Sequence, residues 1–205
     1  MTTKTQHETS KPTESSTAPA TLTPRQRALF SDLLQSFLTD GFESFTIDGA
    51  TRKFHCSKST IYALGGSRDE VIRRVLISFF REVTRRTDIA LRSYKSPKSA
   101  LEHYFHAIGT ALEPASEAFM RDLAKEPVAK EIYDTNTKAA TKKIAALIEK
   151  GVANGDFRTE NPDFIAALIA TSLEQIQQGT FSETIDAHQA YRQFGTLLLH
   201  GLSNH

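Results

Sequence analysis

Apolar side chains recur at helical spacing along almost the whole chain from residue 23 onward. In the first such stretch, Phe30, Leu33, Leu34, Phe37 and Leu38 fall at positions i, i+3, i+4, i+7 and i+8, which places them on one stripe of an α-helix. No run alternates apolar and polar residues as a half-buried strand does. The pattern therefore predicts an all-α fold.

Helix start and stop signals divide this pattern into about nine helices. Thr23, Pro24 and Gln26 predict a capping box at the start of the first helix, and Gly41 predicts its end. The other helices are expected to begin at Thr46, Ser57, Ser67, Ser96, Ser116, Pro127, Asn161, and Thr184 or Asp186.

The charge is unevenly distributed along the chain. The net charge is only +1, which excludes a wholesale polycation or a solvating acidic chain. Residues 25–95 nevertheless carry a net charge of +5, and residues 96–205 carry −4. This asymmetry favours a chain of which only one end meets a polyanion; the alternative is a chance distribution of charge.

Composition limits the other classes of protein. The single cysteine, Cys56, excludes a disulfide framework. The longest apolar run, residues 164–170, is too short to span a bilayer, and no signal-peptide pattern opens the chain. We therefore expect a cytoplasmic protein with no membrane partner. Residues 1–22 are dominated by Ser, Thr and Pro and are expected to form a disordered tail.

Two short predicted helices separated by a few residues make the arrangement of a helix-turn-helix. The second of them is expected to run from Lys58 to about Leu64. Ile61 and Leu64 share one face and can pack inward, whereas Lys58, Ser59 and Tyr62 share the opposite face. That outer face offers donors for phosphates or base edges. The alternative reading of the same residues is an ordinary solvated helix surface.

The order of motifs in this region resembles the DNA-binding head of the TetR/AcrR family of transcriptional regulators. The close resemblance covers about residues 25–76, and a weaker one covers residues 148–158. The matching residues are Asp40-Gly41-Phe42, Thr46, Ser57-Lys58-Ser59-Thr60-Ile61-Tyr62 and Ser67-Arg68-Asp69-Glu70-Val71. The chain departs from the family pattern at three places. His55 stands where a small residue is usual, and Asp48 stands where some members have a base-contacting arginine. Ala63-Leu64-Gly65 follows the tyrosine where the family usually has an aromatic pair.

The resemblance implies three segments: the tail at 1–22, a DNA-binding head over 23–82 with its helix-turn-helix at about 45–64, and an effector-binding and dimerisation domain over 83–205. Thr46 and Tyr62 would hold phosphates, and Arg68 would anchor the DNA backbone beside them. The complete set of implied DNA contacts is Thr46, Ser57, Lys58, Ser59, Thr60, Tyr62 and Arg68.

The C-terminal helices are predicted to supply a dimer interface and a ligand pocket. In the family, the last two helices pair with those of a second chain; here the interface residues would be Phe164, Leu168, Leu173, Ile176, Phe194 and Leu198. The pocket residues would be His103, Tyr104, His106, Phe119, Met120 and Tyr133. Ordinary helix packing is the alternative for each pocket residue. No third ligand accompanies the two histidines, so we expect neither a metal nor a cofactor.

These features together predict a homodimeric DNA-binding repressor that a small apolar effector releases from a near-palindromic operator. The first alternative is a helical carrier or adaptor that binds an apolar ligand or a protein without DNA. The second is a helical enzyme, which is disfavoured because no nucleophile–base set and no catalytic carboxylate pair is evident.

Overall fold

The computed structural model describes residues 22–158 and 161–203. The predicted tail therefore lies outside the described residues, apart from Leu22. Nine α-helices and no strand occur within these ranges, which confirms the all-α class. The helices are α1 (Pro24–Asp40), α2 (Ile47–Lys53), α3 (Lys58–Tyr62), α4 (Arg68–Ser93), α5 (Pro97–Leu112), α6 (Glu117–Lys125), α7 (Pro127–Ala153), α8 (Pro162–Gln177) and α9 (Ala187–Leu202).

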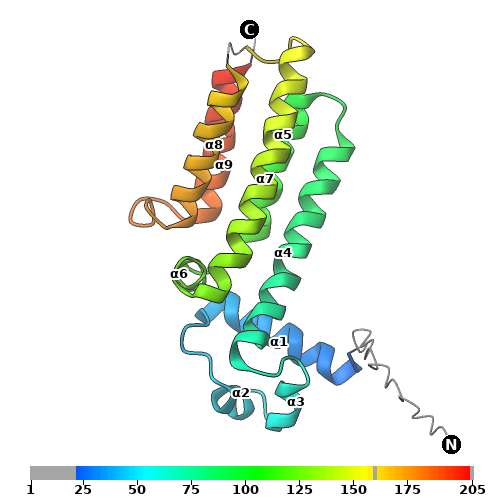
Figure 1. The fold of residues 1–205 in the computed structure, drawn as a ribbon, viewed down its shortest axis with the longest axis vertical. Coiled ribbons are helices and arrows are strands. Elements are labelled where there is room, and N and C mark those ends of the chain that lie inside the picture. The colour runs from blue at the N-terminus through cyan, green and yellow to red at the C-terminus, as the bar shows by residue number, and fades with distance from the viewer. Residues whose placement is uncertain (1–21, 159–160, 204–205) are drawn as a thin grey trace, which may run out of the picture.

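The helices form a small head joined to a longer bundle (Figure 1). Helices α1, α2 and α3 lie at one end of the molecule, and α4 rises from them beside α5 and α7. Helices α8 and α9 lie side by side and complete the bundle, with α9 packed along α5. None of the helices in the described ranges combines the length and the apolar character needed to cross a membrane.

Local capping residues place the helix starts. The Thr23 hydroxyl accepts the backbone N–H of Gln26, and the Gln26 side chain accepts that of Thr23, so the predicted capping box is present. Gly41 ends α1 with φ = 76°, a backbone conformation that glycine adopts without strain. Helix α3 is shorter than predicted and ends at Tyr62, because Leu64 N–H bonds to the Ile61 carbonyl in a tighter i to i+3 turn.

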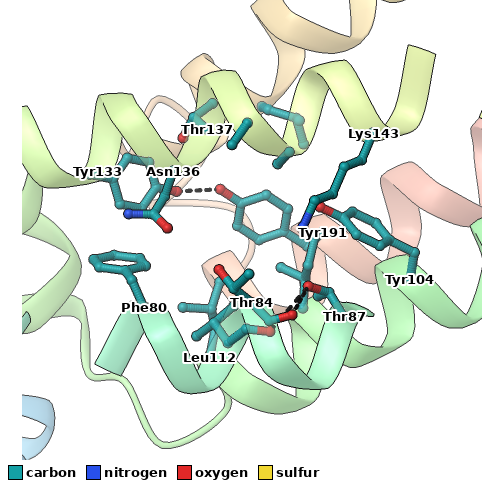
Figure 2. Close-up of a pocket in the computed structure, with 15 residues that line it drawn as sticks. Phe80, Thr84, Thr87, Tyr104, Leu112, Tyr133, Asn136, Thr137, Lys143 and Tyr191 are labelled. Atoms are coloured by element: carbon teal, nitrogen blue, oxygen red, sulfur yellow. Dashed lines mark hydrogen bonds between the residues drawn. The ribbon is translucent and has the colours of Figure 1, made fainter. Parts of the chain in front are cut away.

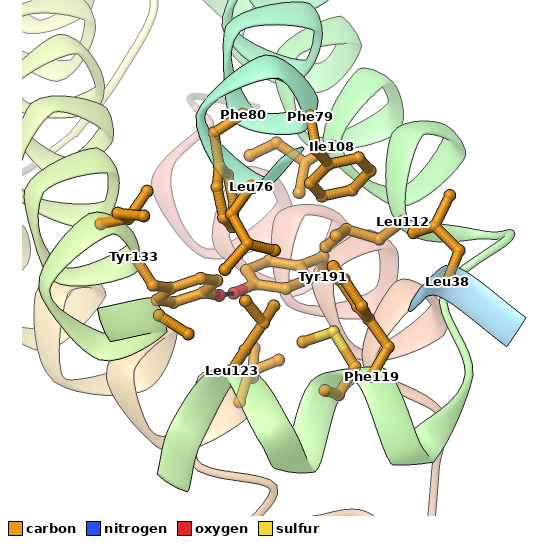
Figure 3. Close-up of a cluster of buried hydrophobic side chains, with 14 of the residues drawn as sticks. Leu38, Leu76, Phe79, Phe80, Ile108, Leu112, Phe119, Leu123, Tyr133 and Tyr191 are labelled. Carbon is orange, nitrogen blue, oxygen red and sulfur yellow. Dashed lines mark hydrogen bonds between the residues drawn. The ribbon is translucent and has the colours of Figure 1, made fainter. Parts of the chain in front are cut away.

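Helix α4 belongs to both the head and the bundle. It is continuous over 26 residues, so the predicted domain boundary at 82/83 falls inside a helix rather than in a linker. Its first half carries the buried residues Val71, Ile72 and Val75, which belong to the same apolar core as Ile61 and Leu64. Further along, Phe79 packs edge-on against Phe119 of α6, whose ring also contacts Phe42. The cores of head and bundle are therefore continuous, as Figure 3 shows around Phe79 and Phe119.

Candidate nucleic-acid interface and ligand pocket

The two faces of α3 differ as the sequence spacing predicts. Ile61 and Leu64 are buried in the head, with 0% and 1% of their surface exposed. On the other face, Lys58 and Ser59 are exposed, and Tyr62 is 46% exposed although it is aromatic. The short helix α3 thus packs on the head through apolar side chains and presents an ammonium, a hydroxyl and a phenol to solvent.

Hydroxyl side chains organise the starts of α2 and α3. Thr46 accepts the Gly49 N–H, and Ser57 accepts the Thr60 N–H. The Ser57 hydroxyl also exchanges hydrogen bonds of 2.8 Å with the hydroxyls of Ser59 and Thr60. These side chains therefore already serve as caps in the free protein, and their DNA contacts stay a prediction.

Lys58 is held by an acidic neighbour. Its Nζ lies 2.6 Å from Oδ1 of Asp48 on α2, and both side chains are more than half exposed. The ion pair raises the pKa of Lys58 and lowers the pKa of Asp48, chiefly through the hydrogen bond and the charge interaction between them. A phosphate that approaches Lys58 must therefore compete with the Asp48 carboxylate.

Arg68 occupies a different environment from the predicted one. Its Nε donates to the Phe45 carbonyl at 2.9 Å, and its Nη2 donates to the carbonyls of Phe42 and Glu43. Its Nη1 contacts the carboxylates of Asp69 and Glu126. The guanidinium thus holds the loop between α1 and α2, here called the junction loop (residues 41–46), against α4 and the start of α7.

Phosphate contact by Arg68 stays a prediction, and a phosphate would have to compete with the partners that the guanidinium already has. A guanidinium has five N–H donors, and those of Arg68 face five acceptors within the protein. The local sequence gave no sign of this, because Glu126 lies 58 residues away along the chain. In this structure the donors of Arg68 are engaged within the protein, and the side chain holds the loop that leads into the helix-turn-helix.

Asp122 of α6 holds the junction loop from the other side. Its Oδ2 accepts the backbone N–H groups of Phe42 and Glu43, the latter at 2.8 Å. Only 2% of Asp122 is exposed. A Cβ added at Gly41 would lie 2.4 Å from the same Oδ2, so the loop can approach the carboxylate only with glycine there. Sequence analysis missed Asp122 because no local pattern distinguishes it from a surface acid.

A cavity lies inside the bundle, enclosed by side chains of α4, α5, α7, α8 and α9 (Figure 2). It offers about 90 Å³ of free space. The Tyr133 and Tyr191 hydroxyls are hydrogen-bonded across it at 2.5 Å. Its lining residues are Phe80, Val83, Thr84, Thr87, Tyr104, Ile108, Leu112, Tyr133, Asn136, Thr137, Ala139, Ala140, Lys143, Leu173 and Tyr191.

Several large apolar side chains on the last two helices face solvent. On α8, Phe164 is 58% exposed and Leu168 is 48% exposed, and on α9, Leu197 is 71% exposed. Single exposed apolar residues are common, but three on two adjoining helices mark a surface suited to association.

The family model for the QacR-like protein, C-terminal region, a TetR-type domain, matches residues 92–204, which is more than half of the chain. The chain belongs to the TetR/AcrR family. It is therefore a DNA-binding transcriptional regulator, and regulators of this family are generally not enzymes. No curated protein sequence matches the chain.

Solved structures show the same fold at low sequence identity. The ketosteroid transcriptional regulator KstR2 of Mycobacterium tuberculosis is 19% identical, with a TM-score of 0.61 and coverage of 90% of this chain and 98% of that chain. The TetR family regulator PfmR of Thermus thermophilus is 17% identical, with a TM-score of 0.63 and coverage of 86% and 99%. A TetR/AcrR regulator of Thermobifida fusca is 17% identical, with a TM-score of 0.64 and coverage of 86% and 97%.

The cavity of this TetR/AcrR regulator contains only part of the predicted pocket set. Tyr104 and Tyr133 line it. Phe119 instead fills the core between head and bundle, and Met120 faces a separate groove beside the α8–α9 turn. His103 and His106 line an outer groove between α5 and α9. The role of these four residues in ligand binding stays a prediction, because helical spacing identifies an apolar face but not the helix that covers it.

The predicted dimer residues of the regulator also divide into two groups. Phe164 and Leu168 are exposed, as an interface requires. Leu173 and Ile176 are 2% and 6% exposed and pack inside the chain's own bundle, so their part in a dimer interface stays a prediction. Phe194 and Leu198 are half-buried, and the sequence analysis missed the much more exposed Leu197.

We expect Asp48→Asn to strengthen DNA binding by this regulator several-fold. The substitution removes one acid from the DNA-reading surface and frees Lys58 for a phosphate. One additional phosphate contact steepens the log–log dependence of affinity on salt by about 0.9. Fluorescence anisotropy with a labelled duplex over a salt series measures both quantities. Asp163→Asn on α8 makes the same change of charge far from α3, and an equal gain in that control would contradict the explanation.

Proposed function

We propose that this regulator is a homodimeric repressor whose two α3 helices bind a near-palindromic operator and whose cavity binds the releasing effector. The observation that carries the proposal is the division of α3 into a buried apolar face and an exposed face with Lys58, Ser59 and Tyr62. These side chains supply donors both to phosphates and to base edges.

The dimer is supported by the exposed apolar side chains of α8 and α9. A twofold assembly is the commonest arrangement of identical chains. It presents two recognition helices to half-sites separated by about 34–36 Å, one turn of B-form DNA. The operator then carries the same twofold symmetry as the protein.

Effector release is supported by the path of α4. This helix lines the cavity with Phe80, Thr84 and Thr87, and its first residue, Arg68, holds the junction loop. The free space of about 90 Å³ is smaller than the roughly 150 Å³ of an apolar cavity that admits benzene. An occupant that enters the bundle completely therefore has to displace the surrounding helices. A ligand that binds this displaced arrangement more tightly shifts the population away from the DNA-binding state.

Lys58→Ala and Tyr62→Ala test the proposed DNA surface. Each is expected to weaken binding to a duplex selected from a random pool, and the lysine variant to reduce the salt slope by about 0.9. Light scattering is expected to show an unchanged dimer, because both side chains are exposed in the head. Lys138→Ala on the exposed face of α7 serves as the charge-matched control. Unchanged affinity in both α3 variants would contradict the assigned surface.

The alternative function, which the cavity by itself would also fit, is a helical carrier or adaptor that does not bind DNA. Such a protein would bind the ligand but would enrich no duplex from the random pool. The repressor acts where the chromosomal DNA is, so we place it in the cytoplasm, with neither catalysis nor a membrane contributing to its function.

A further inference from the structure

We propose that the cavity binds a small carboxylic acid, with its carboxylate at Lys143 and its apolar body among the rings of Phe80, Tyr133 and Tyr191. This inference rests on the proposed function, because it names the chemical class of the effector for the same cavity. Four features of the cavity carry it: its charge, the position of that charge, its neutral phenols and its apolar wall.

The formal charge in the lining of the cavity is positive and comes from Lys143. Among the lining residues in the described part of the chain, Lys143 carries the only formal charge. Asp88 pairs with Lys143 but does not line the cavity. A ligand therefore meets the ammonium within the lining, and the Asp88 carboxylate that balances part of its charge lies outside the lining.

Lys143 retains the capacity to bind a second acceptor. Its ammonium has three donors, and the hydrogen bond to Asp88 uses one of them. The side chains of Lys143 and Asp88 are 34% and 33% exposed, so this end of the cavity adjoins solvent. A ligand carboxylate placed here keeps part of its hydration while its body enters the bundle, which lowers the cost of moving its charge out of water.

The tyrosines supply hydroxyl groups without negative charge. Burial raises the pKa of Tyr104 and Tyr133 well above the ordinary value, and it raises the pKa of Tyr191 to about 12. All three phenols are therefore protonated at neutral pH. Aromatic faces can attract a cation, but the charged group in the lining is the Lys143 ammonium, and the Asp88 carboxylate beside it is already paired.

The remaining wall is mostly apolar, with polar side chains at Thr84, Thr87, Asn136 and Thr137, and it suits a compact hydrocarbon body. Leucine, isoleucine, valine and alanine side chains and the Phe80 ring surround the space between the two polar ends (Figure 2). One polar end consists of Lys143 and Tyr104, and the other of the hydrogen-bonded Tyr133 and Tyr191. The free space of about 90 Å³ has to expand even for a single ring, so a body of one ring or a short chain displaces the surrounding helices less than a multi-ring system does.

Three probes with the same body test the class of ligand: 3-phenylpropanoate, 3-phenylpropanamide and 3-phenylpropylammonium. Titration calorimetry with the full-length purified protein is expected to give an affinity at least tenfold higher for the acid than for the ammonium compound, with the amide between them. Equal or tighter binding of the ammonium compound would overturn the proposal, as would the absence of binding by the acid at millimolar concentration.

Two variants with opposite expected effects identify the ammonium. Lys143→Met is expected to abolish the preference for the acid over the amide. Asp88→Asn is expected to raise the affinity for the acid several-fold, because the competing carboxylate is gone. Lys142→Met, at the exposed neighbouring position on α7, is the matched control and should leave the order of probes unchanged. If Lys143→Met does not fold, the direction of the Asp88→Asn effect decides, and weaker binding of the acid there rejects the proposal.

Operator affinity measured with and without the acid separates this inference from the proposed function. Binding of the acid without any change in operator affinity supports the ligand class and contradicts the effector role. An operator bound normally by a protein that prefers the ammonium compound supports the repressor and contradicts the ligand class. Release from the operator by the acid in the wild type, but not in Lys143→Met, supports both.

Discussion

Asp122→Ala is expected to lower the free energy of unfolding by about 2–5 kcal/mol, since each buried donor left without an acceptor costs about 1–3 kcal/mol. The carboxylate accepts the N–H groups of Phe42 and Glu43 at a position that is 2% exposed. Its Oδ1 forms no hydrogen bond within the described residues, although Arg121 Nε lies 3.9 Å away. Removal of this poorly solvated oxygen offsets part of the loss. The loss of Oδ2, the one oxygen that accepts both N–H groups, outweighs that gain because these two hydrogen bonds anchor the junction loop.

Denaturant unfolding of three variants tests this role of Asp122. Asp122→Asn keeps one acceptor oxygen and is expected to lie between the wild type and the alanine variant. Arg121→Ala removes the exposed neighbour on α6, and a substitution of this kind is expected to change stability by no more than about 0.5 kcal/mol. An alanine variant as stable as the wild type would show that the junction loop does not depend on this carboxylate.

The positions of the helices could be predicted because their signals are local. A cap such as Thr23 or Ser67 bonds to an N–H three residues away, so both partners appear in a short stretch of sequence. The end of α3 was placed two residues too late because a tightening turn and a continuing helix share the same apolar residues, Ile61 and Leu64. Boundaries of short helices therefore depend on tertiary packing as well as on sequence.

The contacts that organise the site could not be predicted, because they join residues that are distant in sequence. Asp122 meets the junction loop across 80 positions, and Lys143 meets Asp88 across 55. The spacing of apolar residues also identifies the apolar face of a helix, but it does not show which other helix packs against that face. Leu173 and Leu168 have the same periodic signal on α8, yet one lines the cavity and the other faces solvent.

Leu197→Glu is expected to separate the dimer into monomers and to lower operator affinity by about 10²–10⁴-fold, the usual gain from linking two binding modules. Leu197 is 71% exposed, so its replacement removes little packing within the protomer. At an interface between two copies, however, each new carboxylate would be buried without a counter-charge. The two heads would then bind half-sites independently and lose the benefit of simultaneous attachment.

Ile89→Glu is the control that separates the effect of the position of the charge from the effect of added charge itself. Ile89 is an aliphatic residue on α4 with 52% exposure, so its replacement adds the same charge to the surface of a different helix. Light scattering is expected to find a monomer for Leu197→Glu and a dimer for Ile89→Glu, with operator affinity lost only in the former. Two dimeric variants would place the interface away from Leu197. Two monomeric variants would mean that added charge, rather than position, disrupts the assembly.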